Sequence, residues 1–239
     1  MTITDLPPAA RRAAAAYAVL SVANIVLSDA GLRVGDWITK PALMPLLAVF
    51  TWLAADTGAR SLLRLPLAGI LLGGAGDAAL IGKGTWFLVG MGCFAAGHIC
   101  YLIAFRRRGA FDAIGRPALA GYAAVWVLLL ALTFSGLGSL LVPVVAYSLL
   151  LVGMAVAASG LSRTAAVGGA LFLVSDGFIA LGLAEVHLLP HQSVLVMPTY
   201  VAAQFLLALA WAGLAPARTA RRAGDPVASF PAGAEKTSG

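Results

Sequence analysis

The chain has 239 residues, of which 61% are hydrophobic and only 11% are charged. This composition excludes an ordinary soluble domain, because too little of the surface would be able to face water. The net charge of +6 does not indicate a nucleic-acid partner either, since the basic residues lie in short clusters between apolar runs. We therefore expect an all-α, polytopic integral membrane protein with no nucleic-acid partner.

Breaks at Pro, Gly and charged clusters divide the chain into apolar runs, and each approaches the roughly 20 residues that a helix needs to cross a bilayer. In chain order, the predicted spans are residues 13–30, 38–55, 65–82, 85–105, 117–135, 139–159, 164–183 and 192–215. The sequence thus predicts a single bundle of about eight transmembrane helices over residues 1–215. Residues 216–239 are rich in Ala, Gly, Pro and Arg, and are predicted to form a disordered cytoplasmic tail.

The Lys and Arg residues predict the orientation of this bundle in the membrane. With a cytoplasmic start, the inner segments contain Arg11, Arg12, Arg60, Arg64, Arg106, Arg107, Arg108, Arg116, Arg163, Arg218, Arg221, Arg222 and Lys236. The outer segments contain only Arg33, Lys40 and Lys83. Such a bias is typical of cytoplasmic segments, so we expect both termini in the cytoplasm and an even number of spans. The short loops and the Ala-rich, Arg-rich composition favour a bacterial inner membrane.

Two pairs of runs share one spacing. Asp77 in the third run and Tyr101 in the fourth are 24 residues apart, and so are Asp176 in the seventh run and Tyr200 in the eighth. A short outer turn joins the two helices in each pair. Because four spans return the chain to its starting side, this spacing predicts two four-helix halves in parallel orientation.

Asp77 and Asp176 are acidic residues inside apolar runs, away from the predicted helix ends. A carboxylate at such depth costs several kcal/mol unless it is paired, protonated or hydrated, so it normally faces a cavity or the bundle interior. Both runs lead from the cytoplasmic to the outer side, which places both aspartates in the outer half of the bilayer, where they could share one pocket. The alternative is that each carboxyl is protonated or bonds to a neighbouring helix and serves packing only.

Other polar side chains accompany the two aspartates. Lys40 opens the second predicted helix at its outer end, where it would reach a carboxylate or a lipid phosphate, or serve as an interfacial anchor. His98 and Tyr101 are three residues apart and share a helix face; His98 would shuttle protons or bond between helices, at a depth that argues against direct contact with an aspartate. Tyr200 and Gln204 are four apart and also share a face, with an interhelical hydrogen bond as the structural alternative for the glutamine.

Other site motifs are incomplete. The segment from Gly73 to Gly76 lacks the Lys-Ser/Thr end of a phosphate-binding loop, and within a membrane run it predicts close helix packing. Glu185, His187 and His191 lie in one outer loop but do not form a clear set of metal ligands. We therefore expect no metal site and no other cofactor.

Five short motifs, taken together, resemble the YhhN-like lysoplasmalogenases. They are Lys40-Pro41-Ala42-Leu43-Met44-Pro45; Gly76-Asp77-Ala78-Ala79-Leu80; Phe87, Gly90, Phe94, His98 and Tyr101; Ser175-Asp176 with Ala180; and Tyr200 with Gln204. Their order and spacing also fit that family. The resemblance extends from about residue 36 to residue 210, and neither the first predicted helix nor the tail takes part in it.

This resemblance implies a membrane hydrolase that cleaves the vinyl ether bond of a lysoplasmalogen, giving a fatty aldehyde and a glycerophosphoethanolamine or glycerophosphocholine. Its partners would be the lysophospholipid substrate and membrane lipid. Asp77 and Asp176 would supply one acid and one base, as paired carboxyls do in glycoside hydrolysis. Lys40 would hold the phosphate or lower the proton affinity of one aspartate. The side chains that would support catalysis or orient water or substrate are His98, Tyr101, Ser175, Tyr200 and Gln204.

The residues alone leave two other functions open. Proton-coupled carriers also place acidic residues near the middle of the membrane between repeats, so a transporter of small molecules or lipids fits the same aspartates. A non-catalytic lipid-binding or scaffolding membrane protein is the third interpretation. Release of aldehyde from a lysoplasmalogen by the purified protein would distinguish the hydrolase from both.

Overall fold

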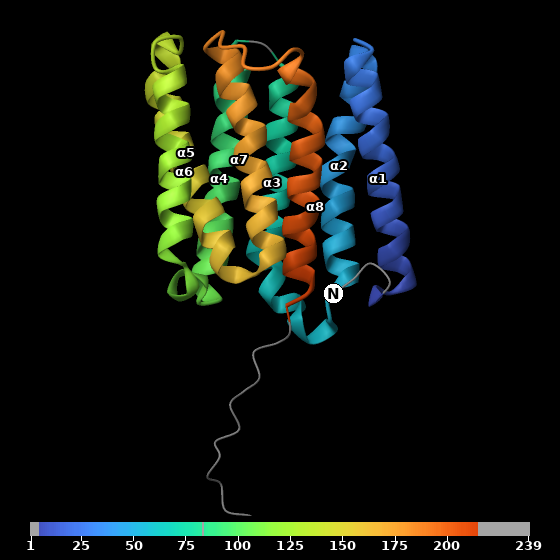
Figure 1. The fold of residues 1–239 in the computed structure, drawn as a ribbon. Coiled ribbons are helices and arrows are strands. Elements are labelled where there is room, and N and C mark those ends of the chain that lie inside the picture. Colours follow the sequence, from blue (N-terminus) through green and yellow to red (C-terminus); the bar gives the residue numbers. More distant parts are fainter. Residues whose placement is uncertain (1–4, 83, 215–239) are drawn as a thin grey trace, which may run out of the picture.

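In the computed structural model, the described residues are 5–82 and 84–214, without the side chains of residues 33–35. They form a bundle of long helices joined by short connections, and this part of the chain contains no strand (Figure 1). The predicted tail at 216–239 and the predicted boundary at residue 215 lie outside the described residues. So do five of the basic residues behind the predicted orientation, namely Lys83, Arg218, Arg221, Arg222 and Lys236.

The long helices are α1 (Pro8–Asp29), α2 (Arg33–Ala54), α3 (Arg64–Ile81), α4 (Trp86–Arg107), α5 (Arg116–Thr133), α6 (Leu141–Leu161), α7 (Arg163–Leu183) and α8 (Val196–Ala212). Short 3-10 turns lie in the connections: η2 (Thr57–Leu63), η3 (Ala110–Ala113), η4 (Gly138–Leu140) and η5 (Gln192–Leu195). Among the described residues, 8 helices are long and apolar enough to cross a membrane, which confirms the predicted fold class and number of spans. α1 begins before the predicted residue 13, because Pro8 suits the first position of a helix and Arg11 and Arg12 continue it.

Glycines allow α3 to approach its neighbours closely. A Cβ atom on Gly76 would lie 3.1 Å from the carbonyl oxygen of Gly90 on α4, and one on Gly74 would lie 2.7 Å from Cβ of Met44 on α2. This is the small-residue packing that membrane helices use, and it confirms what the glycine-rich segment predicts. Since Asp77 directly follows Gly76, close packing on both sides fixes the part of α3 that carries it.

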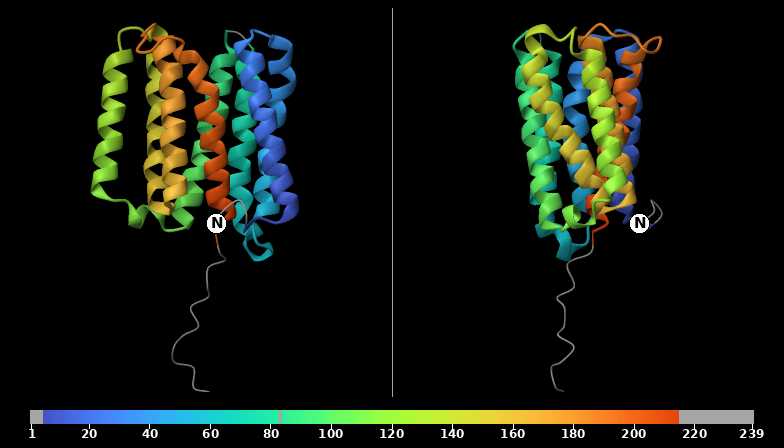
Figure 2. Two further views of the ribbon diagram at one scale, coloured as in Figure 1. Left: turned by 45° about the vertical axis from the view of Figure 1, so that its right-hand side comes forward. Right: turned by 60° about the vertical axis from the view of Figure 1, so that its left-hand side comes forward.

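The order of the helices in space relates the two halves of the chain. α3 packs against α2 and α4, and α7 packs against α6 and α8. Across the middle, α4 packs against α6, and α8 packs against α2. α1 and α5 lie at opposite edges of the bundle (Figure 1 and Figure 2). The contacts of α3 with α2 and α4 correspond to those of α7 with α6 and α8, and the contact of α4 with α6 corresponds to that of α8 with α2. This correspondence supports the predicted internal repeat.

The two ends of the bundle differ in charge. The α1–α2, α3–α4, α5–α6 and α7–α8 connections form one end, at the top of Figure 1, which we call the pocket end. At or near the opposite end, the described basic residues are Arg11, Arg12, Arg60, Arg64, Arg106, Arg107, Arg108, Arg116 and Arg163. Of the described Lys and Arg residues, only Arg33 and Lys40 belong to the pocket end. The cytoplasmic location of the arginine-rich end stays a prediction.

Candidate active site

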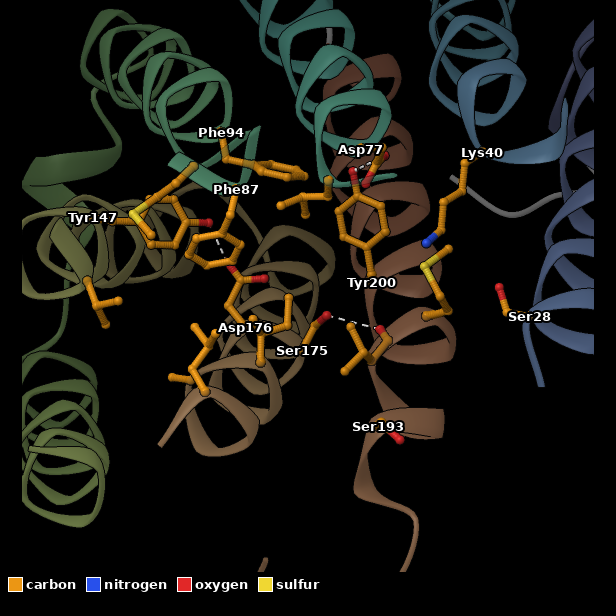
Figure 3. A pocket seen from close by; sticks show the side chains of 18 of the residues that line it. Ser28, Lys40, Asp77, Phe87, Phe94, Tyr147, Ser175, Asp176, Ser193 and Tyr200 are labelled. Carbon is orange, nitrogen blue, oxygen red and sulfur yellow. Dashed lines mark hydrogen bonds between the residues drawn. The ribbon is translucent and has the colours of Figure 1, made fainter. Parts of the chain in front are cut away.

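A cavity of about 510 Å³ lies inside the pocket end of the bundle. Side chains from every long helix except α5 line it, and Asp77 of α3 and Asp176 of α7 are both among them (Figure 3). The volume falls in the range of small-molecule sites, which is about 300–1,000 Å³. The structure therefore brings the two predicted acids, one from each half of the chain, to one cavity rather than to the lipid-facing surface.

Asp77 is held by a chain of hydrogen bonds that crosses three helices. The Tyr200 hydroxyl donates to Oδ2 of Asp77 at 2.8 Å, and the Gln204 amide donates to the Tyr200 oxygen at 3.3 Å. The Tyr101 hydroxyl in turn donates to Oε1 of Gln204 at 3.3 Å. All four side chains are buried. Of these four, only Asp77 and Tyr200 line the cavity, and the hydrogen bonds of Gln204 and Tyr101 reach Asp77 through Tyr200.

Asp176 has a separate chain of partners. The Tyr147 hydroxyl on α6 donates to Oδ2 of Asp176, and Nε2 of His98 lies 3.2 Å from the Tyr147 oxygen. With the Tyr147 proton engaged by Asp176, His98 is the donor to Tyr147. As its predicted depth suggested, His98 reaches the aspartate only through this intermediate tyrosine.

Tyr147 is the main cavity residue that sequence reasoning missed. It lies in the predicted run 139–159, with no acidic residue nearby in sequence. The one available signal was its hydroxyl, since a phenol deep in an apolar span needs a hydrogen-bond partner. That signal indicates a partner but does not say which one.

Aromatic rings surround the two tyrosine–aspartate pairs. Phe94 of α4 stands edge-on to Tyr200 with ring centroids 6.0 Å apart, and Phe172 of α7 does so at 5.5 Å. Phe172 also packs edge-on against His98 at 4.9 Å. Edge-to-face packing restricts ring rotation, so it holds the Tyr200 hydroxyl toward Asp77 and the His98 ring toward Tyr147.

Lys40 lies on the cavity wall formed by α1 and α2. Its Nζ atom is 3.7 Å from Oδ1 of Asp36, which also accepts hydrogen bonds from Ser28 at 2.5 Å and from Asn24 at 3.1 Å. Lys40, Asp36 and Ser28 all line the cavity. The sequence predicted a carboxylate or a lipid phosphate as the partner of Lys40. The structure shows a carboxylate, that of Asp36. Sequence reasoning missed Asp36, Asn24 and Ser28, because they precede the motifs or lie at their edge.

Ser175 lines the cavity beside Asp176, but its hydroxyl is already engaged. It donates to the backbone carbonyl oxygen of Val196 at 3.0 Å. This bond ties α7 to the start of α8, so the contact of Ser175 is structural. It fixes the backbone next to Asp176 relative to the helix that carries Tyr200.

Residues 35–211 match the sequence model of the YhhN family. This chain belongs to the YhhN family. It is similar to the curated lysoplasmalogenase TMEM86B of Rattus norvegicus, being 34% identical over 170 residues that cover 68% of this chain and 67% of that protein. The same protein of Homo sapiens is 34% identical over 168 residues (68% and 69%), and that of Sus scrofa over 173 residues (70% and 71%). No solved structure matches this one at a significant level.

The YhhN match contains all of the predicted site residues but begins after α1. Asn24 and Ser28, which hold Asp36 at the cavity, therefore lie on a helix outside the matched region. α1 is nevertheless part of the bundle, because it packs along α2 and its Tyr17 hydroxyl donates to the carbonyl oxygen of Val201 on α8 at 3.0 Å.

Proposed function

We propose that this YhhN protein is a lysoplasmalogenase that hydrolyses the vinyl ether bond of a lysoplasmalogen to a fatty aldehyde and a glycerophosphoethanolamine or glycerophosphocholine. The names of the similar proteins and the family membership support the activity. The structural observation that carries the proposal is the presence of Asp77 and Asp176 on one cavity within the membrane-spanning bundle.

Vinyl ether hydrolysis requires an acid and a base. A proton is added to the double-bond carbon that is not bonded to oxygen, which leaves an oxocarbenium ion at the carbon that is bonded to oxygen. A water molecule, deprotonated as it attacks, adds to that carbon and forms a hemiacetal. The hemiacetal hydroxyl then gives up its proton as the bond between carbon and the glycerol oxygen breaks. The glycerol oxygen takes up a proton and leaves as an alcohol, and the chain becomes an aldehyde.

Asp77 and Asp176 supply the acid and the base in this proposal. One carboxylic acid donates the proton to carbon, and the other carboxylate accepts a proton from water, as in glycoside hydrolysis. Tyr200 and Tyr147 each donate a hydrogen bond to one aspartate, which fixes the direction of the carboxyl group. Fixed carboxyls matter because catalysis depends on holding the proton donor, water and substrate in a reactive arrangement.

The rest of the cavity suits an amphiphile. On the side of α4, α6 and α7, the lining beyond Tyr147, Ser175 and Asp176 is apolar, with Phe87, Met91, Val144, Ile179 and Leu183 available to the alkenyl chain. On the side of α1 and α2, Lys40 would bind the phosphate. The scarcity of basic residues at the pocket end supports a cavity that opens to the outer leaflet, with both termini in the cytoplasm.

The test is a substrate panel on the full chain purified in detergent. Alkenyl, alkyl and acyl lysophospholipids with the same head group and chain length are supplied. Release of the free glycerophospho head group is measured for each lipid, and aldehyde is measured for the alkenyl lipid. We expect aldehyde from the alkenyl lipid, and no cleavage of the alkyl or acyl lipid. Because a detergent solution has no membrane gradient, transport cannot account for this product. Failure to release aldehyde from the alkenyl lipid, or equal cleavage of the acyl lipid, would overturn the proposal.

A further inference from the structure

A pair of opposite charges lies on the cavity wall away from the aspartate pair. Nζ of Lys40 and Oδ1 of Asp36 are 3.7 Å apart, and each side chain is 23% exposed. Both line the cavity, and Figure 3 shows Lys40 and Ser28 on the far side of Tyr200 from Tyr147 and Asp176. An interfacial anchor needs only a lysine, so the acidic partner facing the cavity calls for another explanation.

Asp36 is held in place from α1. Ser28 and Asn24 donate to its Oδ1, and the Asn24 amide donates in addition to the Thr39 hydroxyl at 2.7 Å. Asn24 is completely buried. Two neutral donors and one ammonium thus fix a carboxylate at the cavity edge, which is how proteins position a charged group for recognition.

We infer that Asp36 and Lys40 together recognise a zwitterionic phospholipid head group, with Lys40 on the phosphate and Asp36 on the ammonium. This inference rests on the proposed function and deepens it by assigning head-group selection to two residues. In ethanolamine and choline head groups a two-carbon linker joins phosphate and ammonium, a separation on the scale of the 3.7 Å between Nζ and Oδ1. The head group and the Asp36–Lys40 pair can therefore lie antiparallel, with the phosphate at Lys40 and the ammonium at Asp36.

Selectivity follows from the same pair. A lysolipid with a bare phosphate or an uncharged alcohol as head group has no cation for Asp36 and brings only negative charge beside that carboxylate. Like charges placed together reject a ligand, and such repulsion is a usual source of specificity. The pair thus favours amine-bearing head groups, whereas Lys40 alone would bind any phosphate.

The location of the pair fits the proposed reaction. α2 packs against both α3, which carries Asp77, and α8, which carries Tyr200. A head group held at α2 places the glycerol and its vinyl ether toward the two aspartates, with the chain continuing to the apolar wall near Phe87 and Ile179. The Asp36–Lys40 pair therefore binds the substrate without taking part in the proton transfers.

The experiment compares two alkenyl lysolipids of one chain length on the full chain in detergent, one with phosphoethanolamine and one with a bare phosphate. We expect the wild-type protein to prefer the amine-bearing lipid by about tenfold in kcat/KM. Asp36→Asn should reduce this preference to about twofold or less, by lowering kcat/KM for the ethanolamine lipid and raising it for the bare-phosphate lipid. Lys40→Met should lower kcat/KM for both. Asp29→Asn is the matched control, since Asp29 is an exposed acid at the same end, outside the cavity lining, and it should leave the ratio unchanged.

A binding measurement keeps the inference testable without catalysis and without a variant. Calorimetry on the wild-type protein compares glycerophosphoethanolamine with glycerol 3-phosphate, and tighter binding of the amine-bearing compound is expected. If aldehyde is released but neither measurement shows a preference, the inference fails while the proposed function stands. If no lipid yields aldehyde, the proposed function fails, and the binding comparison alone decides the head-group site. An unchanged ratio in a folded Asp36→Asn protein also overturns the inference.

Discussion

Tyr200 on α8 donates a 2.8 Å hydrogen bond to Asp77 on α3, across 123 residues of sequence. This bond joins the second half of the chain to the acid of the first half. Tyr101, the residue at the corresponding spacing in the first half, bonds to Gln204 and to neither aspartate. Tyr101 and Tyr200 thus stand at matching spacings from the two aspartates, but of these two tyrosines only Tyr200 contacts a proposed catalytic acid.

Removal of either carboxyl group should abolish the proposed reaction. For Asp77→Asn and for Asp176→Asn we expect kcat to fall by at least about a hundredfold, since general acid–base groups contribute about 10²–10⁴-fold. The measurement is aldehyde release from an alkenyl lysolipid, with size-exclusion chromatography to verify folding. Asp56→Asn, at an exposed position in the connection between α2 and α3, is the control and should retain full activity. A folded variant at either site with more than half of the wild-type rate would contradict the assignment.

Loss of one tyrosine hydroxyl should lower turnover without preventing substrate binding. In Tyr147→Phe the ring remains but Asp176 loses its hydrogen-bond donor, so we expect kcat to fall by about tenfold to a hundredfold with little change in KM. Tyr122→Phe provides the comparison, because the Tyr122 hydroxyl donates at 3.4 Å to the carbonyl oxygen of Ala166, away from the cavity. That variant should stay within about twofold of wild type. Equal effects of the two changes would argue against a role for Tyr147.

His98 should act through Tyr147 and not independently. His98→Phe preserves the aromatic packing against Phe172 while removing the nitrogen that contacts the Tyr147 hydroxyl. We expect the double variant with Tyr147→Phe to be no slower than Tyr147→Phe alone, because coupled residues are not additive. Steady-state kcat values for the four proteins of this cycle provide the check. Losses that simply multiply would show that His98 has a separate role.

Close packing of α3 on α4 should be sensitive to one methyl group. A Cβ atom on Gly76 would lie 2.7 Å from the Phe94 ring and 3.1 Å from the Gly90 carbonyl oxygen, so Gly76→Ala should destabilise the fold by about 1–3 kcal/mol. Gly92→Ala on α4 is the matched control, since its Cβ would meet nothing within 4 Å. Thermal unfolding in detergent should show a lower midpoint for Gly76→Ala only. If Gly76→Ala unfolds at the same midpoint as wild type, α3 and α4 are not closely packed at this position.

The pocket end should face away from the cytoplasm. Single cysteines replace exposed Asp29 at the pocket end or exposed Asp112 at the opposite end, in a background with Cys93 and Cys100 changed to serine. A membrane-impermeant maleimide added to intact cells should label the first cysteine and not the second, because arginine-rich segments remain on the cytoplasmic side. The reverse pattern would place the cavity on the cytoplasmic leaflet.

The sequence by itself determined the spans and the two acids. Hydropathy is a one-dimensional property, and the bilayer requires roughly 20 apolar residues per helix, so the positions of the spans follow from the order of residues. A carboxylate within such a run is so costly in lipid that Asp77 and Asp176 stand out without any knowledge of the packing.

The tertiary structure decided which side chains meet. Whether Tyr147 faces Asp176, or whether Ser28 of α1 reaches Asp36 of α2, depends on the rotation of each helix about its axis and on the identity of its neighbours. In lipid these are set by the fit of small residues and by hydrogen bonds between helices, not by hydrophobic periodicity, because both the lipid and the bundle interior are apolar. For that reason the partners of the acids and the charged wall at Lys40 could be identified only once the helices were packed.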